Sequence, residues 1–102
     1  MNLKEIEYIM KIAEEKNITR AAERLFITPS ALNQQLHRLE TELGVPLFYR
    51  NGNRWYPTQA GEIYLDSARE LLRIKKETYH RIQDIAEQKK RNLSIGLPPD
   101  RG

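Results

Sequence analysis

The spacing of apolar residues at the start of the chain predicts a short amphipathic helix. Leu3, Ile6, Ile9 or Met10, and Ala13 recur three to four residues apart, which is the spacing of one face of an α-helix and not that of a strand. Residues 2–16 are therefore expected to form a helix with one buried face.

A second, shorter helix is predicted to begin at Thr19 and to end at Leu25. The Thr19 hydroxyl can accept a hydrogen bond from an unpaired backbone N–H, which makes it a suitable helix cap. Phe26 and Ile27 are expected to form the following turn and to fill the core beneath it.

A third helix is predicted from Pro29 to Leu43. Thr28 can cap it, Pro29 suits its first position because no N–H is needed there, and Gly44 suits the left-handed residue that ends it. One face is a stripe of leucines, formed by Leu32, Leu36, Leu39 and Leu43. The opposite face is polar and consists of Ser30, Gln34, His37, Arg38 and Thr41, with Asn33 on its flank. The leucines are expected to bind the helix to the domain, which leaves the polar face for a partner.

Two helices joined by a short turn within residues 18–43 form a helix-turn-helix, and the residues that follow predict a wing. Residues 47–57 contain two aromatic-rich runs around Asn51 and Gly52, a strong signal for a tight β-hairpin. The predicted fold is mainly α. Residues 1–58 are expected to form a winged helix-turn-helix domain of three helices and a two-stranded wing.

A long helix is expected to follow over residues 59–91, with Thr58 as its cap. Its apolar residues alternate steps of three and four, a heptad-like seam that only Lys75 interrupts. The residues expected to dimerise along this seam are Leu65, Ala68, Leu72, Tyr79, Ile82, Ile85 and Ala86. A lone helix would expose the seam to water, so pairing with the same helix of a second chain is expected. Packing on its own domain is the alternative, and it is expected for the first two turns, where Gly61 is interpreted as making room for the preceding helices.

Residues 92–102 are expected to begin a further domain. Apolar residues alternate from Leu93 to Leu97 as they do in a strand, and Pro98 ends the run. A single strand has no pairing partner here, so the segment is interpreted as the stub of a domain that this chain lacks. A flexible tail is the alternative.

The distribution of charge favours a polyanionic partner more than the total charge does. The net charge is +3 and the sequence pI about 9.3, yet residues 24–39 and 43–61 contain no carboxylate although the chain has 14 acidic residues. A carboxylate opposite a phosphate costs Coulomb energy, so these segments suggest a surface kept clear for nucleic acid. In windows this short, chance is the alternative.

Other features argue against several classes of protein. No apolar run is long enough to span a bilayer, and acidic residues interrupt the segment where a signal peptide would be apolar. With 0 cysteines there is no disulfide framework, which fits a reducing compartment. His37 and Glu40 have a spacing found in metal sites, but two further ligands are lacking. No nucleophile–base pair or Gly-rich phosphate loop is found, so no enzyme, no metal and no cofactor are expected.

Several short motifs occur along the chain in a fixed order. They are Ala13-Glu14-Glu15, Thr19 to Leu25, Ser30-Ala31-Leu32, Gln35-Leu36, Leu39-Glu40, Glu42 to Val45, Leu47-Phe48, Arg50, and Thr58 to Gly61. Together they make residues 1–91 resemble the N-terminal region of the LysR-type transcriptional regulators. Residues 93–96 are similar to the first strand of that family's effector-binding domain.

The resemblance implies that the third helix enters the major groove of double-stranded DNA and that the wing lies at the flanking backbone and minor groove. The residues implied to bind DNA are Thr28, Pro29, Ser30, Asn33, Gln34, His37, Arg38, Arg50 and Arg54. Asn33 and Gln34 depart from the serine and arginine that are common there. Because Asn and Gln pair well with adenine, whereas Arg prefers guanine, a bias towards adenine is expected at the bases they reach.

Simpler interpretations of these side chains remain. The polar residues of the third helix can be ordinary surface, and Arg38 can form an ion pair with Glu42 one turn later. The wing aromatics Tyr49, Trp55 and Tyr56 can stack on single-stranded bases, although packing of the wing onto the helices is favoured.

The chain is therefore interpreted as the DNA-binding module of a homodimeric bacterial regulator of the LysR type, which reads an interrupted inverted repeat. A small-molecule effector is expected to bind only in the absent C-terminal domain. The protein is expected in the cytoplasm, at the nucleoid when bound to DNA. The alternative function is a non-specific architectural DNA-binding protein, or a helical module that only dimerises.

Overall fold

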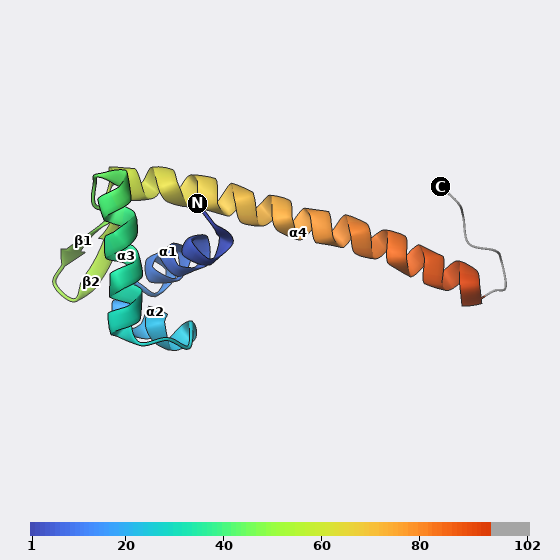
Figure 1. Ribbon diagram of the computed structural model, residues 1–102, viewed down its shortest axis with the longest axis horizontal. Coiled ribbons are helices and arrows are strands. Elements are labelled where there is room, and N and C mark those ends of the chain that lie inside the picture. The colour runs from blue at the N-terminus through green and yellow to red at the C-terminus, as the bar shows by residue number, and fades with distance from the viewer. Residues whose placement is uncertain (95–102) are drawn as a thin grey trace. The chain divides into compact units, whose positions relative to one another are not determined.

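The computed structural model describes residues 1–94 and shows four helices and one two-stranded sheet within them (Figure 1). The elements are α1 (Leu3–Glu15), α2 (Ile18–Arg24), α3 (Pro29–Leu43), β1 (Phe48–Asn51), β2 (Arg54–Pro57) and α4 (Gln59–Ser94). This confirms the predicted winged helix-turn-helix followed by a long helix. Residues 1–68 form one compact unit, and α4 from Arg69 onward belongs to a second unit.

An asparagine, and not the expected threonine, caps α2. The Asn17 Oδ1 accepts a hydrogen bond from the Arg20 N–H at 2.9 Å, and α2 begins at Ile18. The prediction that Thr19 caps this helix is therefore wrong. Asparagine is as good a cap as threonine or better, and here it precedes Thr19 in the chain, so Thr19 lies inside the first turn.

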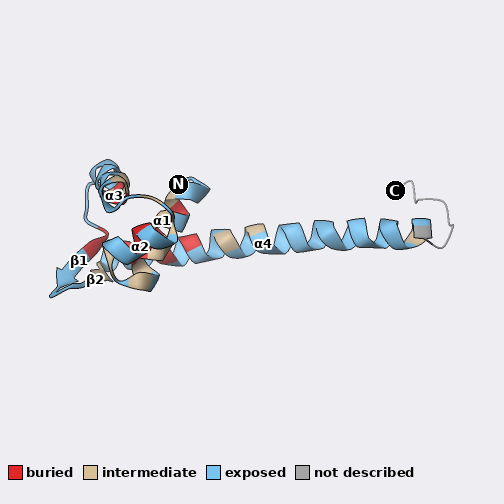
Figure 2. Cartoon of the chain, turned by 90° about the horizontal axis from the view of Figure 1, so that it is seen from below, coloured by how far each residue is buried: buried red, intermediate tan, exposed pale blue. Residues whose placement is uncertain are grey.

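The core of residues 1–68 is built from side chains of every helix and from the start of the wing (Figure 2). Its buried residues are Ile6, Ile9, Ile12, Ala21, Ala22, Leu32, Leu36, Leu39, Leu47, Phe48, Tyr64, Leu65 and Ala68. The predicted leucine stripe of α3 is confirmed except at Leu43, which is 48% exposed. Leu43 is the last residue of α3, just before the left-handed Gly44, so it lies at the margin of the core.

Phe26 lies in the turn between α2 and α3 and points into solvent. Its side chain is 94% exposed, so the expectation that it fills the core is wrong. The backbone has a φ of 59°, a left-handed conformation that bulky residues rarely adopt. Of the two turn residues, only Ile27 is partly buried.

β1 and β2 pair antiparallel to form the wing. Asn51 lies opposite Arg54, so the turn between the strands consists of Gly52 and Asn53. Gly52 has a φ of 65° whereas Asn53 does not have a positive φ, which is the pattern of a type II′ turn. The predicted hairpin is confirmed, with its turn one residue later than Asn51 and Gly52.

Thr58 closes the base of the wing and caps α4. Its N–H donates to the Leu47 carbonyl at 2.9 Å, and its hydroxyl donates to the Pro46 carbonyl at 2.7 Å. The same hydroxyl oxygen accepts the Gly61 N–H at 3.1 Å, which confirms Thr58 as the cap.

Gly61 lets α4 approach the wing closely. A Cβ at this position would overlap the Leu47 carbonyl oxygen and would lie 3.1 Å from the Pro57 Cβ. The expected close approach is confirmed, but the neighbour is the base of the wing and not the preceding helices.

Tyr64 buries its hydroxyl within the same unit. The hydroxyl oxygen has no hydrogen-bond partner within the described residues 1–94. Burial, with a smaller contribution from the Glu5 carboxylate, raises the pKa of Tyr64 from 10.0 to about 12. The neutral phenol is therefore strongly favoured in the folded chain.

From Arg69 onward, α4 is covered little by its own chain (Figure 2). Its exposed large apolar residues are Leu71, Ile74, Tyr79, Ile82, Ile85 and Leu93. On its polar side, Arg73 contacts Glu70 at 2.6 Å and Glu77 at 2.8 Å. The hydrogen bond and charge of Arg73 lower the pKa of Glu70, and those of Glu70 chiefly raise the pKa of Arg73.

α4 continues to Ser94, the last described residue, and so runs past residue 91, where it was predicted to end. No proline or glycine lies between residues 62 and 94, so nothing in the local sequence stops the helix. Leu93 and Ser94 are helical, so the strand predicted from Leu93 is wrong at these two residues. The remainder of the expected stub, residues 95–102, lies outside the described residues.

Candidate nucleic-acid interface

The N-terminus of α3 is well formed and open to solvent. The Thr28 hydroxyl oxygen accepts the Ala31 N–H at 3.1 Å, and Pro29 occupies the first helical position. Thr28, Pro29 and Ser30 are all exposed. The unpaired N–H groups of such a helix end, together with its dipole, favour a negatively charged partner.

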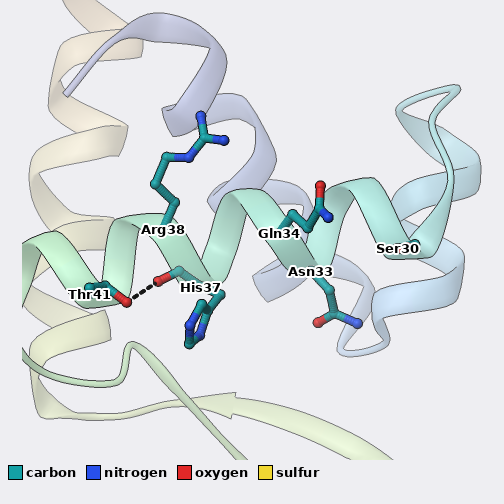
Figure 3. Close-up of a pocket in the computed structure, with 6 residues that line it drawn as sticks. All are labelled: Ser30, Asn33, Gln34, His37, Arg38 and Thr41. Carbon is teal, nitrogen blue, oxygen red and sulfur yellow. Dashed lines mark hydrogen bonds between the residues drawn. The ribbon is translucent and has the colours of Figure 1, made fainter.

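Beyond this end, α3 carries a continuous polar surface, which we call the α3 polar face. It is lined by Ser30, Asn33, Gln34, His37, Arg38 and Thr41, all exposed. Figure 3 shows Gln34 and Arg38 pointing to one side of the helix and Asn33 and His37 to the other. The spacing of four within each pair explains these two rows. Asn33 and Gln34 are thus neighbours in sequence but face different directions.

The carboxylates of α3 leave the polar face unobstructed. Glu40 is turned towards the base of the wing, where its Oε2 accepts the Leu47 N–H at 2.6 Å. Within residues 1–94, no ion pair joins Arg38 to Glu42, so the Arg38 guanidinium keeps its donors for another partner.

Thr41 belongs to the surface but was absent from the residues expected to bind DNA. Its hydroxyl donates to the His37 carbonyl at 2.8 Å (Figure 3). It lies four residues after His37, so helical spacing had already placed it on the polar side. No motif in the sequence indicated that the site extends into the last turns of α3.

The two wing arginines lie on opposite faces of the hairpin. In the register Arg50 lies opposite Trp55, and Arg54 lies opposite Asn51. Because side chains alternate between faces along a strand, Arg50 shares a face with Trp55, whereas Arg54 shares the other with Tyr56. Arg54 also lines a pocket with Glu15 and other residues at the junction of α1 and α2. Both arginines are exposed.

The structure places the predicted dimerisation residues in two different environments. Leu65 is 1% exposed and Ala68 is 0% exposed within residues 1–68, so neither can contact a second chain as folded. Their assignment to a dimer seam is therefore wrong, because the first turns of α4 form part of the domain core. Tyr79, Ile82 and Ile85 are 60%, 59% and 61% exposed.

Within residues 1–94, no group of three or more His, Asp or Glu side chains is placed to hold a metal ion. No helix in that range combines the length and apolar character needed to cross a membrane.

The helix-turn-helix formed by α2 and α3, followed by the β1–β2 hairpin, places the protein in the winged helix-turn-helix class. Residues 3–62 match the family described as bacterial regulatory helix-turn-helix protein, lysR family. The chain belongs to this LysR family, as its motifs had indicated.

Relatives and solved structures agree with this assignment. The chain is 37% identical over 97 residues to the HTH-type transcriptional regulator BudR of Klebsiella aerogenes, covering 95% of this chain and 68% of BudR. It is 35% identical over 102 residues to the DNA-binding transcriptional dual regulator OxyR of Escherichia coli, covering 100% of this chain but only 33% of OxyR. The crystal structure of the BenM_DBD/benA site 1 DNA complex has a TM-score of 0.77 and 30% identity, covering 84% of this chain and 97% of that one.

Proposed function

We propose that this chain binds double-stranded DNA sequence-specifically, as the DNA-binding module of a homodimeric transcription regulator. The observation that carries the proposal is the α3 polar face, whose six exposed side chains include no carboxylate. The face begins at an open helix N-terminus, and an α-helix fits the major groove of B-DNA. The relatives that are described as regulators, and the related structure solved with DNA, support this reading.

Within the α3 polar face, we assign base reading to Asn33 and Gln34. Their amides offer a donor and an acceptor together, which matches the N6 and N7 edge of adenine. Since the two side chains face different sides of α3, they are expected to read different base pairs (Figure 3). Selection of binding sites from a random DNA library tests this: adenine is expected at two separate positions, and guanine at both would contradict it.

We assign the arginines, His37 and the first residues of α3 to contacts that position the protein on DNA without reading its sequence. Arg38, Arg50 and Arg54 are expected to contact phosphates, with the wing beside the flanking minor groove. Thr28, Pro29 and Ser30 are expected to bring the N-terminus of α3 to a phosphate. Contacts of this kind set affinity and its salt dependence more than they set sequence preference.

Dimerisation is proposed through the exposed apolar residues of α4. Tyr79, Ile82, Ile85 and Ala86 are the exposed residues that remain from the predicted seam, and the partly buried Leu72 borders them. The exposed Leu71 is added because it lies on the same stripe of the helix as Ile82. A second copy that covered this surface would create a two-fold axis and pair two α3 helices on an interrupted inverted repeat. Light scattering on the whole chain should show a dimer, and a strict monomer at high concentration would contradict this assignment.

Binding to a selected site and to unrelated DNA, measured over a range of salt concentrations, tests the function as a whole. A sequence-specific protein keeps its preference for the selected site as salt rises, whereas an architectural protein binds both DNAs alike at every salt concentration. Gln34→Ala should erode only the preference, and Arg54→Ala should weaken both sites alike and flatten the salt slope by about one. Gln88→Ala, an exposed glutamine in α4, is the matched control and should change neither. If Gln34→Ala left the preference intact, its proposed role in base reading would fail.

Effector sensing is proposed to lie outside this chain, in a longer protein that carries a C-terminal domain. The chain itself is proposed to need no cofactor and to have no catalytic activity. We further propose that it acts in the bacterial cytoplasm, at the nucleoid when bound to DNA.

A further inference from the structure

The Arg50 guanidinium rests on the ring of Trp55. The guanidinium carbon lies 5.1 Å from the ring centroid, within the range of a cation–π contact. Arg50 and Trp55 are directly opposite in the hairpin, so the contact is built into the strand register. Within residues 1–94, no carboxylate forms an ion pair with Arg50.

The backbone favours this stacking. The Trp55 N–H donates to the Lys16 carbonyl at 3.0 Å, so it points away from β1 and does not bond to Arg50. Arg50 and Trp55 therefore form a non-hydrogen-bonded pair, the type in which opposite side chains lie closer together. The same bond ties the backbone of Trp55 to the C-terminal end of α1.

The Trp55 ring is itself held in place. It packs edge to face against Phe48, with ring centroids 6.3 Å apart and an interplanar angle of 62°. Phe48 is only 7% exposed and belongs to the domain core. A chain of contacts thus runs from the core through Phe48 and Trp55 to the exposed Arg50.

Arg54 has no comparable support. It lies on the other face of the hairpin, next to the turn, and no ring contact to its guanidinium is found in the described part of the chain. The two wing arginines therefore differ in whether an aromatic ring supports the guanidinium.

We propose that Trp55 is a positioning residue that holds Arg50 ready to contact DNA beside the site read by α3, an inference that rests on the proposed function. A cation–π contact uses the charge of the guanidinium and not a conventional hydrogen bond, and no hydrogen bond or ion pair of the Arg50 side chain is found within residues 1–94, so its five N–H donors stay available for phosphate or minor-groove acceptors. Trp55 also limits the rotamers that Arg50 would lose on binding. Arg54 contacts DNA without such support from a ring.

A double-mutant cycle on the full chain tests the proposal. Trp55→Leu should weaken DNA binding about threefold to fivefold, the size expected for one exposed cation–π contact. In an Arg50→Ala background the same Trp55→Leu change should have almost no further effect. Trp55→Phe, which keeps an aromatic ring, should recover part of the loss.

The matched control is Tyr56→Leu. Tyr56 lies on the other hairpin face. Its ring centroid is 5.8 Å from that of Tyr49 and 5.6 Å from the Lys16 Nζ. Its effect on DNA binding should be the same whether Arg50 is present or not. In the free protein, the NMR signals of the Arg50 side chain should show a ring-current shift that Trp55→Leu abolishes and Tyr56→Leu preserves.

The cycle is run on a selected site and on unrelated DNA, because a wing contact with the backbone does not require sequence preference. Coupling between Trp55 and Arg50 on both DNAs without any preference would support the positioning role and defeat the proposed specific function. Equal losses from Trp55→Leu with and without Arg50 would overturn the positioning role and leave the specific function standing. Absence of any DNA binding would overturn both.

Discussion

Leu65 and Ile82 lie on the same helix and have side chains of similar size, yet Leu65 is 1% exposed and Ile82 is 59% exposed. The first lies in the compact unit of residues 1–68, and the second in the part of α4 that belongs to the other unit. Helical spacing of apolar residues is present in both parts. Helical spacing of apolar residues therefore identifies the apolar face of a helix. It does not indicate whether the helix's own chain covers that face.

The largest difference between the two regions is expected for truncation of Leu65. Leu65→Ala leaves a cavity in the core and should lower the free energy of unfolding by about 2–5 kcal/mol. Chemical denaturation followed by fluorescence is a suitable measurement, because the only tryptophan of the chain, Trp55, lies in this unit. A loss under about 0.5 kcal/mol, typical of surface positions, would show that Leu65 is not a core residue.

Gly61→Ala should also destabilise the compact unit, by about 1–3 kcal/mol, because the new methyl group overlaps backbone and not a movable side chain. Ser67→Ala, at an exposed position of the same helix, is the control and should be nearly neutral. Denaturation curves that coincide for the two variants would mean that α4 and the base of the wing are not in close contact.

Tyr64 should make the compact unit sensitive to alkali. Its pKa is raised from 10.0 to about 12 in the folded chain, so its contribution is fully present below pH 10 and is lost as pH rises through 12. The fall in unfolding free energy should be roughly 2–3 kcal/mol, from about 1.4 kcal/mol per pKa unit.

Tyr64→Phe separates this effect from general alkaline denaturation. It removes a buried hydroxyl without a partner in residues 1–94, so it should be neutral or stabilising near pH 7 and should remove the step above pH 10. Tyr79→Phe, at a side chain that is 60% exposed, should leave the step unchanged. An unaltered alkaline profile in Tyr64→Phe would assign the step to another group.

The smallest effect on folding is expected at Ile82. At concentrations low enough to keep the chain monomeric, Ile82→Ala should change the unfolding free energy by less than about 0.5 kcal/mol. At higher concentrations, where the unchanged chain is expected to dimerise, Ile82→Ala should lower the apparent free energy of unfolding. The reason is that dimerisation involves only folded chains and so stabilises the folded state by mass action. A large loss at low concentration would mean that α4 beyond Ala68 packs on its own chain.

Several features determined by local chemistry were predictable from the sequence, although the Asn17 cap of α2 was not. Thr28, Pro29 and Gly44 delimit α3 correctly because capping and backbone preference act within a few residues. The wing was predictable for the same reason, since Gly52 supplies the positive φ that a two-residue turn requires. The α3 polar face followed from helical spacing once these boundaries were known.

Features determined by contacts distant in sequence were not predictable. Leu65 and Ile82 share one sequence pattern, and only the packing of the compact unit distinguishes them. The stacking of Arg50 on Trp55 depends on the hairpin register and on the bond from Trp55 to Lys16.

Phe26 was missed for a different, local reason. It follows the C-terminal end of α2, where its N–H donates to the Glu23 carbonyl and the Ile27 N–H donates to the Ala22 carbonyl, a turn that ends the helix with Phe26 in the left-handed region. Its apolar side chain is exposed.

The hydrogen bonds of Thr58 at the base of the wing allow the wing tip to change in length during evolution. Thr58 donates hydrogen bonds to the Pro46 and Leu47 carbonyls and so holds the two ends of the hairpin together at its base. These bonds do not depend on the length of the loop at the wing tip. The entropic cost of closing a loop grows slowly, by about 0.6 kcal/mol for each doubling of length. Insertions after Gly52 should therefore be tolerated by the helices, so the reach of the wing along DNA can evolve separately from the surface of α3.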